Sequence, residues 1–125
     1  MLGSLLQVAA GGALGASARY LVNISFMRAL GPGFPWATLA ANVAGSFLMG
    51  ALVIWLARRG GQSLAPFLMT GVLGGFTTFS AYSLDVATLW ERGQAGAAAA
   101  YALGSVVLSV GALFAAMWMF RGWLA

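Results

Sequence analysis

Long apolar stretches alternate with short segments rich in glycine, proline or arginine along the whole chain. A helix that crosses a lipid bilayer needs about 20 predominantly apolar residues. Four stretches meet this requirement, and the segments between them carry residues typical of turns and helix ends. The pattern predicts four spanning helices, at about residues 2–26, 36–57, 64–90 and 95–120, in a single domain that covers residues 1–125.

The composition fits a protein whose solvent is lipid. Hydrophobic residues make up 62% of the chain and charged residues only 6%, whereas soluble domains carry about 25% charged residues. A surface so poor in charge cannot stay dispersed in water. We therefore expect an all-α, multi-pass membrane protein.

Missing residue types exclude several functions. The chain has no cysteine, no histidine and no lysine, so thiolate and imidazole metal sites and the usual nucleophile–base pairs are absent. The net charge of +4 comes from arginines near the ends of the apolar stretches, where basic side chains reach lipid headgroups. We expect neither an enzyme nor a nucleic-acid partner.

The arginines are balanced between the two faces of the predicted bundle. One face carries Arg58, Arg59 and Arg121. The other face carries Arg28, Arg92 and, by its position late in the first span, Arg19. Because a bias in basic residues sets orientation in the membrane, this balance predicts that both orientations form. An antiparallel homodimer is then a natural assembly.

Polar residues form two stripes with helical spacing inside the apolar spans. They are Thr38, Asn42 and Ser46 in the second span, and Tyr101, Ser105 and Ser109 in the fourth. Two interpretations remain open for each stripe. Asn42 either joins subunits through an interhelical hydrogen bond or offers amide donors to a ligand. The hydroxyl groups either bond to their own helix or form a row of donors along a path.

The middle of the third span is poor helix material. Two adjacent glycines precede two β-branched threonines in the sequence GVLGGFTTFSAYS, residues 71–83. A break there frees backbone groups, which is tolerated only in a protein interior or beside a cavity, and broken helices form ion sites in transporters. Beyond it, Phe79 and Tyr82 share one helical face; they are either core aromatics or a pair whose positive ring edges face a small anion.

Charged residues inside the spans are scarce, which bears on the competing classes. Arg19 and Asp85 lie in outer turns of their predicted spans and are interpreted as interfacial. A small four-helix multidrug exporter needs a glutamate in its first span, but residues 2–26 contain no acidic residue. An intramembrane hydrolase would have to rely on serine alone, and a purely structural protein would leave the stripes and the break unexplained.

Three motifs resemble the Fluc-type (CrcB) fluoride channel family. They are GGALGASARY at residues 11–20, NVAGSFLMG at 42–50 and GVLGGFTTFSAY at 71–82. They occur in the family's order, and the resemblance covers the whole chain. It implies a fluoride-selective channel in the bacterial inner membrane, built as an antiparallel, dual-topology homodimer with two pores at the subunit interface. Passive export of fluoride through such a channel lowers fluoride toxicity in the cytoplasm.

The resemblance also implies roles for individual residues. The expected fluoride pore comprises Asn42, Phe79, Ser80, Tyr82, Tyr101, Ser105 and Ser109. A structural sodium ion is expected on the dimer axis, held by the backbone carbonyls of Gly74 and Thr77 from each subunit. Arg19 matches the arginine at the end of the family's first motif, with a suspected structural role. The chain departs from the family pattern at Ala81, which replaces a threonine, and at Tyr82, which replaces a phenylalanine.

Overall fold

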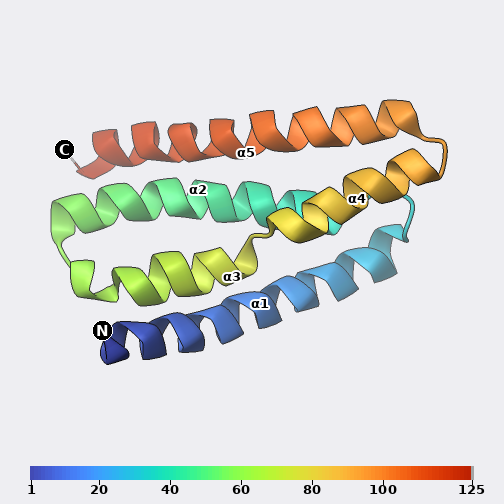
Figure 1. The fold of residues 1–125 in the computed structure, drawn as a ribbon. Helices are drawn as coiled ribbons and strands as arrows, with labels where there is room; N and C mark the ends of the chain where they lie inside the picture. The colour runs from blue at the N-terminus through green and yellow to red at the C-terminus, as the bar shows by residue number, and fades with distance from the viewer. Residues whose placement is uncertain (125) are drawn as a thin grey trace.

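The computed structural model describes residues 1–124, which form a bundle of long helices (Figure 1). Helix α1 spans Leu2–Leu30, α2 spans Trp36–Arg59 and α5 spans Ala95–Leu124. The segment between α2 and α5 is divided into η1 (Gln62–Leu64), η2 (Pro66–Leu73), α3 (Gly74–Phe76) and α4 (Phe79–Glu91). The predicted all-α fold with a broken third helix is therefore confirmed.

Glycines with positive φ end the first two long helices. Gly31 has φ 75° and its N–H donates to the carbonyl of Met27. Gly60 has φ 83° and its N–H donates to the carbonyl of Leu56. Glycine adopts this backbone region without a steric penalty, so each helix stops where the sequence turns back. α1 continues to Leu30, four residues beyond the predicted end of the first span at residue 26.

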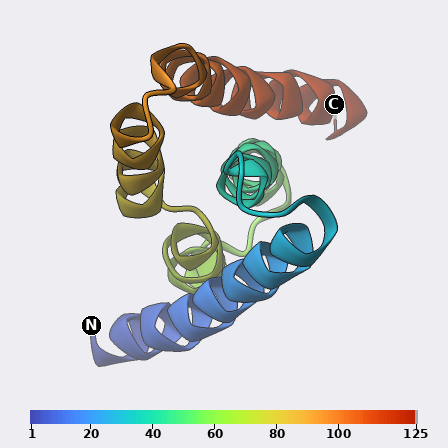
Figure 2. The same cartoon turned by 90° about the vertical axis from the view of Figure 1, so that its right-hand side faces the viewer.

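The third segment changes its packing partner at the break. Its first half, η2 and α3, packs against α1, and its second half, α4, packs against α5. Viewed end-on, the two halves lie on different sides of α2 (Figure 2). A straight helix could not contact both α1 and α5 in this way. The break therefore allows one span to pack against α1 with its first half and against α5 with its second half.

Small residues allow the backbones of α1 and η2 to approach closely. A Cβ added at Gly11 would overlap the carbonyl oxygen of Phe67, and one at Gly15 would overlap the carbonyl oxygen of Val72. η2 is a π-helix over Pro66–Leu73. This wide helical form is rare in proteins, and where it occurs it is often found at functional sites. The spacing of Gly11 and Gly15 thus serves helix packing within one chain.

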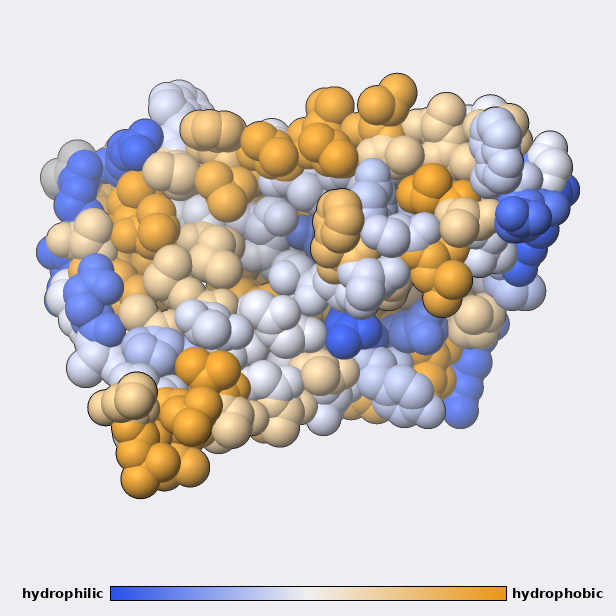
Figure 3. All heavy atoms as spheres, viewed as in Figure 1, coloured by the Kyte–Doolittle hydropathy of each residue, from blue (hydrophilic) through white to orange (hydrophobic). Residues whose placement is uncertain are grey.

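Length and composition identify three strongly apolar candidates for membrane spans, Trp36–Arg59, Gln62–Glu91 and Ala95–Leu124. α1 is long enough, at 29 residues, but its sequence is rich in Gly, Ala and Ser and is less apolar. Hydrophilic residues gather mainly at the two ends of the molecule, and apolar residues cover much of the surface between them (Figure 3). The four predicted spans thus correspond to three strongly apolar segments and one less apolar helix, α1.

Candidate functional site: an uncharged groove at the helix break

The break in the third segment lies at two consecutive threonines. Thr77 has φ −87° and ψ 157°, and Thr78 has φ −152° and ψ 128°. Both residues are therefore extended between two helices. Two extended residues interrupt the N–H-to-carbonyl bonds of the helix, so the polar groups around them need partners from elsewhere.

Asn42 on α2 satisfies both backbone groups of Thr78. Its Oδ1 accepts from the Thr78 N–H at 2.8 Å, and its Nδ2 donates to the Thr78 carbonyl at 3.0 Å. These two hydrogen bonds join the two helices of one chain, whereas the interhelical bond considered from the sequence was one between subunits. One N–H of the amide is left for a further acceptor. Asn42 therefore fixes the break and also lines the space beside it.

Arg19 holds the other side of the break. Its Nε donates to the carbonyl of Gly75 at 3.2 Å. Since α3 ends at Phe76, the Gly75 carbonyl cannot be met by an N–H four residues later in a continuous helix. Because α1 extends to Leu30, Arg19 lies nearer the middle of its helix than the predicted span suggested. Its side chain contacts the break in the middle of the third segment, which differs from the interfacial placement we expected.

Thr78 begins α4 as its N-cap. Its Oγ1 accepts from the N–H of Ala81 at 3.1 Å, as N-cap threonines commonly do. The same hydroxyl lies 3.3 Å from the Oγ of Ser80. This bonding explains the two consecutive threonines of the sequence TTFS, residues 77–80. Thr77 interrupts the helix and Thr78 starts the next one. Capping propensity was a signal available in the sequence, but we did not assign Thr78 a role from it.

A central groove opens beside the break. We use this name for the concave surface formed by residues of α2, the third segment and α5: Asn42, Gly45, Ser46, Met49, Gly74, Thr77, Thr78, Phe79, Tyr82, Ser105, Val106, Ser109, Val110 and Leu113. Within the described residues 1–124, none of its lining residues is charged. The groove combines hydroxyl and amide groups with two aromatic rings and apolar side chains.

The groove brings together most of the predicted site. Five predicted pore residues line it: Asn42, Phe79, Tyr82, Ser105 and Ser109. Gly74 and Thr77, predicted to hold sodium, line it as well. Tyr101, Ser80 and Arg19 do not. Tyr101 is buried, Ser80 is exposed beside Thr78, and Arg19 contacts the break from α1.

The hydroxyl groups near the groove differ in their bonding. Tyr82 donates to the carbonyl of Ala102 on α5 at 2.6 Å. Ser105 is only 4% exposed, and its Oγ has no hydrogen-bond partner among residues 1–124. A buried hydroxyl without a partner is costly. Ser105 therefore carries a buried hydroxyl with an unused hydrogen-bonding capacity at the groove.

A row of aromatic rings leads from the groove toward one end of the bundle. The ring centroids of Phe79 and Tyr82 are 5.3 Å apart, those of Tyr82 and Tyr101 are 5.4 Å apart, and those of Tyr101 and Phe34 are 5.5 Å apart. Tyr101 donates its hydroxyl proton to Asp85 Oδ2 at 3.0 Å. The carboxylate is thus tied to the aromatic row.

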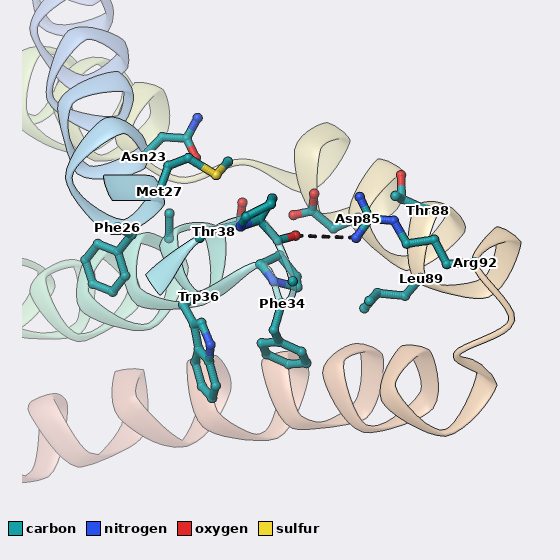
Figure 4. A pocket seen from close by; sticks show the side chains of 15 residues that line it. Asn23, Phe26, Met27, Phe34, Trp36, Thr38, Asp85, Thr88, Leu89 and Arg92 are labelled. Carbon is teal, nitrogen blue, oxygen red and sulfur yellow. Dashed lines mark hydrogen bonds between the residues drawn. The ribbon is translucent and has the colours of Figure 1, made fainter. Parts of the chain in front are cut away.

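A second pocket lies at that end, beneath the connection between α1 and α2 (Figure 4). Asp85 and Thr88 of α4 contribute to it, with Thr38 of α2 and Asn23 of α1. Arg92 borders it and donates through Nη1 to the carbonyl of Pro32 at 3.3 Å. Unlike the central groove, this pocket contains charged residues.

Three long apolar segments, an interrupted helix and an uncharged polar groove define a multi-pass membrane protein with the elements of an ion-conducting site. Comparison with known proteins gives the family. Residues 6–117 match the family described as "CrcB-like protein, Camphor Resistance (CrcB)", and the chain belongs to this family.

Several relatives are similar to this chain over almost their whole length. A protein of Cereibacter sphaeroides (strain ATCC 17029 / ATH 2.4.9) is 65% identical over 125 residues, covering 100% of both chains. One of Paracoccus denitrificans (strain Pd 1222) is 60% identical over 122 residues, covering 98% of each. One of Mesorhizobium japonicum is 51% identical over 119 residues, covering 94% of this chain and 96% of the relative. All three are named "Fluoride-specific ion channel FluC".

Proposed function

We propose that this chain is a fluoride-selective ion channel and not an enzyme. The channel lets fluoride leave the cell passively down its gradient. The names of relatives up to 65% identical over the full chain support this function. The observation that carries the proposal is the central groove, where amide, hydroxyl and aromatic groups meet beside the break.

The chemistry of the groove suits a small, strongly hydrated anion. A pore must replace the ion's water with other hydrogen-bond donors, yet release the ion readily. A fixed positive charge would hold fluoride too tightly, and none lines the groove within the described chain. We assign the donors to Asn42, Ser105 and Ser109, and the polarised ring edges to Phe79 and Tyr82. Ser80 and Tyr101 extend the path beyond the groove.

A second copy of the chain would complete the pore. Phe79 is 77% exposed, although it lies at the break in the middle of a membrane segment. The groove is open on one side, so one subunit supplies only part of a closed path. With Arg19 placed at the break, three arginines remain at one end and two at the other, still close to balance. We propose an antiparallel, dual-topology homodimer with two pores at its interface.

The backbone at the break supports the proposal of a sodium site. The Thr78 N–H, which would meet the Gly74 carbonyl in a continuous helix, is directed to Asn42 instead. Thr77 is extended at ψ 157°, so its carbonyl is turned out of the helical direction. Carbonyls of unwound membrane helices are typical sodium ligands. We propose that Gly74 and Thr77 of each subunit hold a structural sodium ion on the dimer axis.

Fluoride efflux from liposomes tests the function. Purified protein is reconstituted into vesicles loaded with potassium fluoride, with potassium chloride vesicles as a control, and efflux is started with valinomycin. Rapid fluoride release without chloride release is expected. If folded, reconstituted protein releases neither ion, the channel function is wrong. Proton-driven export of cationic compounds should then be measured.

A further inference from the structure

Arg19 is a costly residue for its position. Its guanidinium is always charged, and charged groups within membrane segments are rare unless they serve a function. The two acidic residues of the sequence, Asp85 and Glu91, both lie in α4, beyond the break. The partner that Arg19 has in the structure is neutral, the carbonyl oxygen of Gly75.

The backbone around Gly75 explains how Arg19 reaches this carbonyl. A Cβ added at Gly75 would lie 2.7 Å from the carbonyl oxygen of Gly12 and 3.2 Å from the backbone nitrogen of Ala16. Gly12, Ala16 and Arg19 follow helical spacing on α1, so they share one face. Side chains on a helix lean toward its N-terminus, which brings the Arg19 side chain back over the turn that touches Gly75.

The break is thus held from two helices at two points. Arg19 of α1 bonds to Gly75 at 3.2 Å, and Asn42 of α2 bonds to both backbone groups of Thr78. Thr77 and Phe79, which line the groove, adjoin these fixed points. A change at Gly75 is therefore transmitted through two or three residues of backbone to the groove.

We propose that Arg19 is a positioning residue for the channel, which acts through its Nε–H and not through its charge. By holding the Gly75 carbonyl it fixes the extended residues and the start of α4, and hence the place where Phe79 enters the groove. This inference rests on the proposed function. It assigns to Arg19 a contact with the backbone and no contact with the ion.

Three substitutions separate the hydrogen bond from the charge. In Arg19→Gln, Nε2 stands at the position of the arginine Nε, so the donor remains and the charge is lost. Arg19→Met places a methyl carbon there and removes both. Arg19→Lys keeps the charge but moves the ammonium one atom further along the chain. Arg28→Met is the matched control, because Arg28 is an exposed arginine in the last turn of the same helix.

Fluoride efflux per reconstituted dimer is the first measurement. We expect Arg19→Gln to retain efflux within about threefold of the parent. Arg19→Met and Arg19→Lys should lose about tenfold, the effect of leaving a part-buried carbonyl without its donor. Arg28→Met should match the parent. If Arg19→Lys kept the parental efflux while Arg19→Gln lost efflux, the charge would matter and the proposal would be overturned. Equal efflux in all three variants, whether parental or lost, would also overturn it.

Hydrogen exchange provides a readout that does not depend on ion flux. The Thr78 N–H, bonded to Asn42, should stay protected in Arg19→Gln and exchange faster in Arg19→Met and Arg19→Lys. Equal protection in Gln and Lys would contradict a positioning role. If the parent protein conducts no fluoride, the proposed function fails, while this measurement still decides whether Arg19 fixes the break.

Discussion

The hydroxyl group of Tyr82 donates to the backbone carbonyl of Ala102 at 2.6 Å and thereby ties α4 to α5. Ala102 and Ser105 are three residues apart on α5, so they lie on the same face of that helix. Tyr82 and Ser105 both line the groove, so the tie fixes α4 against α5 where these two residues contribute to it. The family's usual phenylalanine has no hydroxyl with which to make this bond.

The substitution Tyr82→Phe should distinguish the effect of the hydroxyl group from that of the aromatic ring. Because the hydroxyl is already bonded to Ala102, its loss should lower the free energy of unfolding by about 1 kcal/mol and leave fluoride efflux largely unchanged. Thermal unfolding and efflux of the same preparation measure both. Tyr20→Phe on the exposed surface of α1 is the control. A variant that loses efflux would mean that the hydroxyl takes part in ion transfer.

Removing the amide of Asn42 should impair both structure and flux. Asn42→Ala deletes the two hydrogen bonds to Thr78, which should cost about 2 kcal/mol in stability and reduce fluoride efflux by at least about tenfold, because a groove donor is lost as well. Asn42→Asp keeps an acceptor for the Thr78 N–H but has no donor. A fully conductive alanine variant would reduce Asn42 to a packing residue.

Phe79 offers the cleanest test of an aromatic edge in the pore. The side chain is 77% exposed in the subunit, so Phe79→Ile should leave the fold of the subunit intact. Efflux should fall by about tenfold, since an aliphatic chain has no polarised ring edge. Phe114→Ile, at a residue that is 63% exposed on α5, controls for a general effect of lost aromatic surface. Undiminished efflux would remove Phe79 from the pore.

Two neighbouring glycines of α1 should respond differently to the same methyl group. Gly15→Ala would drive a Cβ into the Val72 carbonyl, whereas a Cβ at Gly12 meets nothing within 4 Å. We expect Gly15→Ala to destabilise the protein by about 1–3 kcal/mol, as overpacking does, and Gly12→Ala to be close to neutral. Thermal unfolding in detergent compares them. Equal effects would contradict the close contact between α1 and η2.

Sodium should stabilise the dimer if Gly74 and Thr77 bind it. An ion that binds only the folded state adds about 2.7 kcal/mol at 100 times its Kd, so exchanging sodium for N-methylglucamine should lower the midpoint of thermal unfolding. Potassium at equal ionic strength is the control. Identical midpoints in all three salts would exclude a structural sodium site.

Local sequence signals revealed the helix break but not the contacts that fix it. The pair Gly74–Gly75 followed by Thr77–Thr78 is unfavourable in any helix, so the interruption could be predicted from propensity alone. The bond from Arg19 to Gly75 spans 56 residues, and no local pattern encodes it. Since the predicted first span ended at residue 26 and α1 continues to Leu30, Arg19 was placed too near a helix end.

The spacing of polar residues was equally informative and equally incomplete. Four-residue steps placed Asn42 and Ser105 on helix faces, and both line the groove. The same spacing could not show that Tyr101 is buried and bonded to Asp85, because this depends on how α4 rests on α5. The π-helix at Pro66–Leu73 was not predicted, since its bonding depends on the packing of α1 against it.

The origin of the bonds that hold the break has a consequence for biosynthesis. Both donors, Arg19 and Asn42, belong to helices that are made before the third segment. A chain emerging from the ribosome therefore presents these partners in the bilayer before the interrupted segment needs them. We expect moving the first span to the C-terminus, by circular permutation, to leave the interrupted segment without one of its partners during insertion and to lower the yield of assembled protein.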